Sequence, residues 1–309
     1  MPTVEILYYR EGRHVPALAW LGTLQPGALE VCVVLLERLS LKEAERKQVE
    51  EQQDGKQGPS FLIGKKKKPF KALSCVSLTI GNGMFGLLGP NGAGKTTALR
   101  ILSGLSQPTS GSVKVAGFDA KKEPEKIKKN IGYMCQKFSL YEDLTVKENI
   151  MLYGGIYGMS KVNIKKRTED LLEKLHFEEY GDRLISSLPL GLKQKLAFSV
   201  AVFHEPRIVF LDEPTGGVDP ITRRQFWEMI YETASRGITV FVTTHYMDEA
   251  EYCDRVSIMN EGRIVAIDTP AELKKHYDAE SVEEVFVKIA RPGMKYDIES
   301  ETADNKREV

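Results

Sequence analysis

A glycine-rich run followed by a lysine and two threonines is the stretch of this sequence best suited to chemistry. Residues 89–97 read GPNGAGKTT and fit the pattern G-x-x-x-x-G-K-[ST] without a mismatch. Such a loop turns consecutive backbone N–H groups toward a phosphate, and a helix that begins at its end adds the positive end of its dipole. The residues predicted to contact a nucleotide are Gly89, Pro90, Asn91, Gly92, Ala93, Gly94, Lys95, Thr96 and Thr97.

Within this loop, Lys95 is expected to reach the β- and γ-phosphates of the nucleotide, and the Thr96 hydroxyl is expected to hold Mg²⁺. The alternative is a chance glycine-rich turn. The strand-like run Met84–Leu88 before the loop and the helical pattern of residues 95–104 after it favour the phosphate-binding interpretation.

Two acidic residues follow a second apolar run. Residues 208–211 read IVFL, and Asp212 and Glu213 come directly after them. Ligands of open α/β folds bind at the carboxyl edge of the sheet, so Asp212 is predicted to join the magnesium shell and Glu213 to act as general base on the attacking water. Taken alone, the pair would be a strand end with solvated acids; the phosphate loop in the same chain favours catalysis.

These residues need a scaffold that carries them to one edge. Short apolar runs with strand-like pattern alternate with helical patterns along the chain, which predicts an α/β domain with a largely parallel sheet. The strand-like runs are residues 84–88, 131–135, 208–211, 238–242 and 256–259. Residues 73–80 alternate between apolar and polar side chains and predict a further, half-buried strand.

The residues around Glu213 belong to a longer motif. Residues 211–220 read LDEPTGGVDP, a string that closely resembles a motif of the ABC transporter ATPases. Gln136, after the run 131–135, resembles the Q-loop glutamine of that family, and His245 resembles its switch histidine. Read singly, Gln136 would be a surface residue and His245 a structural one. Their order and spacing relative to Lys95 and Glu213 carry the resemblance.

The resemblance covers about residues 65–290 and implies roles for these residues. Gln136 would sense Mg²⁺ and water as a third metal ligand beside Thr96 and Asp212, and would contact a transmembrane partner. His245 would contact the γ-phosphate and, with Glu213 and Gln136, complete the catalytic set. Asp219 matches the D-loop aspartate, which communicates across a dimer.

The resemblance also implies a fold: a P-loop NTPase of the ABC ATPase type, with a mainly parallel central sheet, an antiparallel β subdomain and an α-helical subdomain at about residues 140–200. Residues 1–60 are expected to form an N-terminal extension and charged linker, and residues 291–309 a polar tail. Residues 28–34 share a weak pattern with residues 281–287. The extension is therefore either the remnant of an upstream ATP-binding domain or unrelated to one.

One motif departs from the family. Where the family has Leu-Ser-Gly-Gly-Gln, this chain has Leu188, Pro189, Leu190, Gly191 and Leu192, followed by a helix predicted at 193–201. The family serine meets the γ-phosphate held by the opposite subunit, and Pro189 lacks that donor, a loss of about 1.5–3 kcal/mol. The variant resembles a branch of exporter ATPases associated with drug efflux. For adenine stacking, the family pattern counts back to Lys67, and Phe70 is either the stacking aromatic or a core residue.

The implied function is ATP binding and Mg²⁺-dependent hydrolysis that power export through a permease on a separate chain. ATP and Mg²⁺ are the expected cofactors, a homodimer or heterodimer of ATP-binding domains is the expected assembly, and the cytoplasmic face of a membrane is the expected location. Lys+Arg and Asp+Glu both number 43, a balance that does not indicate a nucleic-acid partner. Two alternatives remain: a soluble ABC ATPase without a transporter, and a degenerate or regulatory module with weak hydrolysis.

Overall fold

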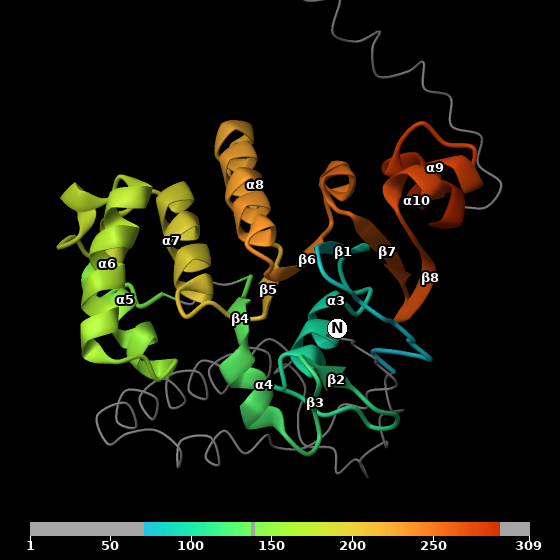
Figure 1. Cartoon of the computed structure of the whole chain (residues 1–309). Helices are drawn as coiled ribbons and strands as arrows, with labels where there is room; N and C mark the ends of the chain where they lie inside the picture. Colours follow the sequence, from blue (N-terminus) through green and yellow to red (C-terminus); the bar gives the residue numbers. More distant parts are fainter. Residues whose placement is uncertain (1–70, 137–139, 291–309) are drawn as a thin grey trace, which may run out of the picture.

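The computed structural model describes residues 71–136 and 140–290, and a six-stranded sheet runs through them (Figure 1). Its strands, in spatial order, are β4 (Ile131–Met134), β5 (Ile208–Asp212), β6 (Thr239–Thr244), β1 (Met84–Leu88), β7 (Arg255–Asn260) and β8 (Arg263–Asp268). Neighbouring strands from β4 to β7 are parallel, and only β8 is antiparallel to its neighbour. The predicted mainly parallel sheet is confirmed.

Each face of the sheet carries its own hydrophobic core. Val209 and Leu211 of β5 pack into one core, whereas Ile208 and Phe210 pack into the other, because successive side chains of a strand point to opposite faces. This burial on both sides explains why the strands read as continuous apolar runs.

The helices divide between the two cores. The first core receives side chains from α5 (Val146–Ile156), α6 (Lys161–Leu175), α7 (Leu190–Val202), α8 (Pro220–Ser235), α9 (Pro270–His276), α10 (Val282–Ala290) and the 3₁₀ helices η2 (Ile185–Ser187) and η3 (Met247–Tyr252). The second receives side chains from α3 (Lys95–Leu102), α4 (Pro124–Asn130) and the hairpin of β2 (Lys114–Val115) with β3 (Phe118–Asp119). A further 3₁₀ turn, η1, spans Glu178–Tyr180. In Figure 1, α5 and α6 lie at the opposite end of the molecule from α9 and α10.

The register of the sheet brings the strand ends level. Met134 pairs with Leu211, Leu211 with Val242, and Val242 with Gly86, so that these four residues form one row across β4, β5, β6 and β1. Gln136, Glu213, His245 and Gly89 each follow that row by two or three residues. The fold therefore delivers all four segments to one edge.

Three details differ from the sequence-based predictions. Residues 73–80 do not form a strand. Val76, Leu78 and Ile80 are buried as the alternation predicts, whereas Leu73 is buried out of phase with them, because the backbone turns at Cys75, which has φ of 53°. Strand β8 was not predicted. Helix α7 begins at Leu190, three residues before its predicted start, with Pro189 as its N-cap in an extended conformation.

Several predictions lie outside the described residues: the extension at 1–60, the adenine candidates Lys67 and Phe70, and the tail at 291–309. The expected helical subdomain at 140–200 corresponds in position to α5, α6 and α7. Within the described ranges, none of the helices combines the length and the apolar composition that a transmembrane segment requires.

Candidate functional site

The phosphate loop joins β1 to α3 and opens at the molecular surface. Gly94, the N-cap of α3, has φ of 107°, and a Cβ at this position would lie 2.8 Å from the carbonyl oxygen of Ala72. Only glycine fits both the backbone angle and the close approach. Asn91, Gly92 and Thr96 are exposed and Thr97 is half-buried.

Lys95 points into the loop. Its side chain is only 4% exposed, and its Nζ donates hydrogen bonds to the carbonyl oxygens of Gly89 at 2.7 Å and Pro90 at 3.3 Å. A buried ammonium requires such oxygen partners because removal of its hydration is costly. The loop therefore holds a fixed positive charge where a phosphate would bind.

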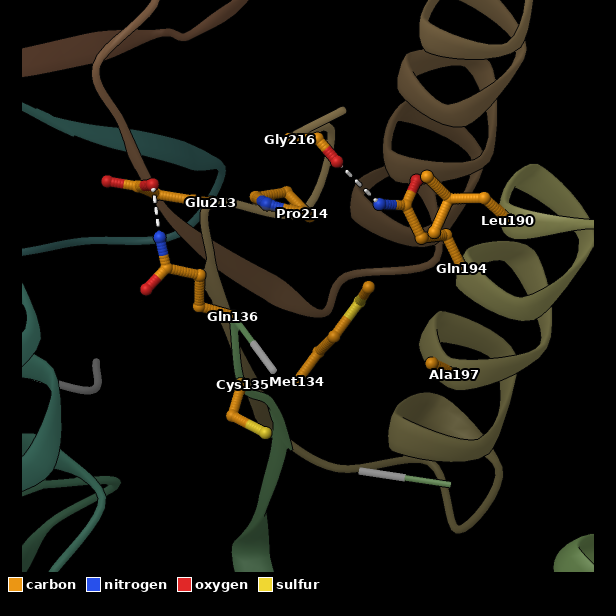
Figure 2. A pocket seen from close by; sticks show the side chains of 9 residues that line it. All are labelled: Met134, Cys135, Gln136, Leu190, Gln194, Ala197, Glu213, Pro214 and Gly216. Carbon is orange, nitrogen blue, oxygen red and sulfur yellow. Dashed lines mark hydrogen bonds between the residues drawn. The ribbon is translucent and has the colours of Figure 1, made fainter. Parts of the chain in front are cut away.

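Three side chains from three segments converge on the Glu213 carboxylate. Lys95 Nζ lies 3.3 Å from Oε1. Gln136 Nε2 donates to Oε2 at 2.7 Å (Figure 2). His245 Nδ1 lies 3.2 Å from Oε2, in close contact but without the geometry of a hydrogen bond. The structure thus brings together the predicted lysine, glutamine, glutamate and histidine.

The backbone at Glu213 is unusual for a residue with a side chain. Its φ is 49°, in the left-handed region that costs a non-glycine residue about 1 kcal/mol or more. The Glu213 N–H donates to the Thr243 carbonyl oxygen at 3.0 Å, and the Gly216 N–H donates to the Glu213 carbonyl oxygen at 3.2 Å. These bonds from both sides hold the strained residue at the end of β5.

Asp212 precedes Glu213 as the last residue of β5 and is 2% exposed. Burial raises the pKa of the Asp212 carboxyl, whereas hydrogen bonds from Thr243 and Thr96 and the charge of Lys95 oppose that rise. Thr243 Oγ1 donates to Asp212 Oδ1 at 2.6 Å.

Thr96 and Asp212 together offer a hydroxyl and a carboxylate oxygen beside the phosphate loop, the hard oxygen donors that Mg²⁺ prefers. No group of three or more His, Cys, Asp or Glu side chains suited to a metal occurs in the part of the chain described. Two protein oxygens leave the other positions around the ion to phosphates and water, which is how Mg²⁺ usually binds beside a nucleotide. Gln136, the third predicted ligand, turns its amide nitrogen toward Glu213.

The variant motif, residues 188–192, lies at the start of α7. Leu188 is buried, whereas Pro189 is exposed and Leu190 is 39% exposed. Pro189 is the N-cap and makes no side-chain cap hydrogen bond. Gly191 is required by packing, since a Cβ there would lie 2.8 Å from Thr222 Cγ2 on α8. Asp219 caps α8 by accepting from the Thr222 N–H at 2.9 Å.

A small cavity of about 70 Å³ separates this end of α7 from Glu213 (Figure 2). It is lined by Met134, Cys135, Gln136, Leu190, Gln194, Ala197, Glu213, Pro214 and Gly216. Leu190 is the variant-motif residue in this lining. The other four predicted residues of the motif, Leu188, Pro189, Gly191 and Leu192, do not line the cavity.

Several polar contacts beside the site were missed by the sequence analysis. The Thr215 hydroxyl donates to the carboxylate of Glu249, a fully buried residue, at 2.5 Å, and Arg223 Nε lies 3.8 Å from the same oxygen. The Arg223 guanidinium also lies 4.3 Å from the centre of the Tyr246 ring, next to His245.

A further missed contact joins α7 to the turn that follows Glu213. Gln194 Nε2 donates to the Gly216 carbonyl oxygen at 3.0 Å. Gln194 lies between Lys193 and Lys195 in the sequence, so the local pattern gave no signal that its side chain is buried.

Comparisons with known proteins agree with this geometry. A family model described as ABC transporter matches residues 73–216. The chain is 46% identical over 213 residues to the probable multidrug ABC transporter ATP-binding protein YbhF of Escherichia coli (strain K12). This match covers 69% of this chain and 37% of YbhF. It is 34% identical over 241 residues to the daunorubicin resistance ATP-binding protein DrrA2 of Streptomyces coeruleorubidus, covering 77% of this chain and 75% of DrrA2.

Solved structures give the same result. The structure of an ATP-binding subunit of an ABC transporter superposes with a TM-score of 0.66 at 28% identity, covering 74% of this chain and 96% of that one. A dimeric ATP-binding cassette in a post-hydrolysis state with ADP and Pi superposes with a TM-score of 0.60 at 26% identity, covering 67% and 94%. The chain thus spans nearly all of each solved cassette but little more than a third of YbhF.

Proposed function

Because this chain belongs to the ATP-binding proteins of the ABC transporter family, we propose that it hydrolyses Mg·ATP and thereby powers export of a substrate through a separate transmembrane partner. The observation that carries the catalytic part is the convergence of Lys95, Gln136 and His245 on Glu213. The export part is supported by relatives named for multidrug transport and daunorubicin resistance.

In this proposal the phosphate loop and Lys95 bind the triphosphate, and Thr96 and Asp212 hold Mg²⁺. The metal would supply positive charge that offsets the charge of the phosphate oxygens. Glu213 takes a proton from the attacking water, His245 faces the γ-phosphate, and Gln136 orients the water or the metal.

The contact between Lys95 and Glu213 suggests how the Glu213 carboxylate becomes free to act on the attacking water. The Lys95 ammonium lies 3.3 Å from the Glu213 carboxylate, so the two groups form an ion pair. Phosphate oxygens compete for the same ammonium. When Lys95 turns toward them, the Glu213 carboxylate leaves this ion pair and can contact the attacking water.

The assembly we propose is a head-to-tail pair of ATP-binding domains, either two copies of this chain or this chain with a second domain. The start of α7, from Pro189 to Leu192, would face the nucleotide of the other subunit, and Asp219 would lie near the same boundary. ATP then favours the closed pair through its higher affinity for that state. The segment between Gln136 and Leu188 would transmit closure to the permease at the cytoplasmic face of a membrane.

The test uses the full chain, first alone and then with a membrane partner in lipid vesicles. Calorimetry with ATP should register binding, and phosphate release should require Mg²⁺ and stop when EDTA is added. Addition of the partner should raise the ATPase rate and hold the chain on sedimented vesicles. ATP binding without any hydrolysis in both settings would contradict the enzymatic proposal. Hydrolysis that no membrane partner stimulates would contradict the transport proposal.

A further inference from the structure

Gln194 is a buried polar residue on a helix face that is otherwise apolar. Its side chain is 6% exposed, and its neighbours Leu196 and Ala197 on α7 belong to the core. Its Nε2 donates to the Gly216 carbonyl oxygen at 3.0 Å, whereas its Oε1 has no hydrogen-bond partner among the described residues (Figure 2). A buried amide with an unpaired oxygen destabilises the core. The hydrogen bond to Gly216 is therefore the contact that could account for a glutamine at this position.

That hydrogen bond reaches Glu213 through a single residue. Gly216 accepts from Gln194 at its carbonyl oxygen, and its N–H donates to the Glu213 carbonyl oxygen at 3.2 Å. Glu213 has φ of 49°, a conformation that persists only where the surrounding structure holds it. Gln194 fixes the turn that provides one of the two holding contacts.

The same helix carries the variant motif at its start. Leu190 and Gln194 are four residues apart on α7 and therefore lie on one face. Leu190 packs over Gly217, where its Cδ2 lies 3.7 Å from the position of a Cβ. If the start of α7 moved, Leu190 and Gln194 would move with it. Their contacts with Gly217 and Gly216 would then displace the turn that follows Glu213.

We infer that Gln194 is a positioning residue that holds the Glu213 carboxylate in its working place and couples it to the start of α7 in the same chain. The inference rests on the proposed function, because it takes Glu213 as the base. We place Gln194 away from the nucleotide, since it contacts the turn that follows Glu213 rather than the phosphate loop. Its loss should therefore act on turnover and leave ATP binding unchanged.

The first experiment replaces Gln194 with methionine, which keeps the length of the side chain and removes the donor. Turnover of ATP by Gln194→Met should fall about tenfold, the equivalent of one hydrogen bond, with KM and the calorimetric affinity for ATP within twofold of the wild type. Gln194→Leu repeats the test with a branched side chain. The matched control is Lys195→Met, which removes a hydrogen bond of 2.7 Å from α7 to Gln225 on α8 but does not touch the turn.

A double-mutant cycle separates positioning from a general structural role. If Gln194 acts through Glu213, adding Gln194→Met to Glu213→Gln should leave the residual rate of that variant unchanged. A further tenfold loss in the double variant would overturn the inference, as would wild-type turnover by both Gln194→Met and Gln194→Leu. Failure of Glu213→Gln to slow hydrolysis would instead overturn the proposed function. All rates are compared well below the melting temperature of each variant.

Discussion

Gln136 Nε2 donates a 2.7 Å hydrogen bond to Glu213 Oε2 although 77 residues separate the two in the chain. The contact exists because β4 and β5 are parallel neighbours whose ends are level, so each strand delivers the residue beyond its end to the same place. His245 reaches the same carboxylate from β6. The catalytic hypothesis therefore depends on a sheet register and can be tested one residue at a time.

Glu213→Gln should retain ATP binding and lose at least about a hundredfold in hydrolysis, because the amide keeps the size of the side chain but cannot accept the proton. Calorimetry and phosphate release measure the two quantities. The control is Glu251→Gln, an exposed acid paired with Lys274 at 2.8 Å. Hydrolysis by Glu213→Gln at the wild-type rate would remove Glu213 from its assigned role.

Lys95→Ala should weaken ATP binding about 10- to 100-fold, because hydrogen bonds to charged groups contribute about 1.5–3 kcal/mol each. The measurement is calorimetric titration with Mg·ATP. Lys114→Ala, at an exposed lysine on β2, should leave the affinity unchanged. An unaltered affinity in Lys95→Ala would contradict the assignment of the phosphate loop.

Asp212→Asn should raise the melting temperature near neutral pH while it removes the Mg²⁺ dependence of ATP binding. Burial raises the pKa of the folded Asp212 carboxyl above its ordinary value, so the folded state binds its proton more tightly than the unfolded state does. The ionised carboxylate therefore destabilises the fold at any pH above that raised pKa, and the penalty is lost as the pH falls toward the ordinary value.

The difference in melting temperature between Asp212→Asn and the wild type should consequently be largest at neutral to alkaline pH and shrink on acidification. Thermal unfolding at several pH values checks this. A difference that grows on acidification would contradict the assignment.

Pro189→Ser should increase both stability and turnover. Serine at an N-cap accepts a hydrogen bond from the first turn of its helix, a gain of about 0.5–2 kcal/mol, and Pro189 supplies no such bond to α7. Its hydroxyl also restores the donor toward the opposite nucleotide, which should raise the ATPase rate about tenfold. A higher melting temperature without faster hydrolysis would mean that the hydroxyl serves only the helix.

The alternating strand and helix patterns predicted the parallel sheet, and the resemblance to the family predicted that Gln136 and His245 join Lys95 and Glu213. The sheet brings the four together because parallel strands end at the same edge. It did not reveal the contact of Thr215 with Glu249 or that of Gln194 with Gly216, which join residues 34 and 22 positions apart between segments with no common periodicity. Residues 73–80 show that a sequence pattern can predict burial without predicting the secondary structure. Their alternation predicted the burial of Val76, Leu78 and Ile80, but these residues are not part of the sheet in the structure.

The backbone at position 213 has a consequence for how this protein tolerates change. A φ of 49° suits asparagine better than glutamate, whereas only glutamate has the reach and the carboxylate that the chemistry needs. Selection for thermal resistance alone would therefore drift away from glutamate at this position, and selection for turnover would restore it. A saturation library scored separately for both properties should rank the substitutions at residue 213 in nearly opposite order.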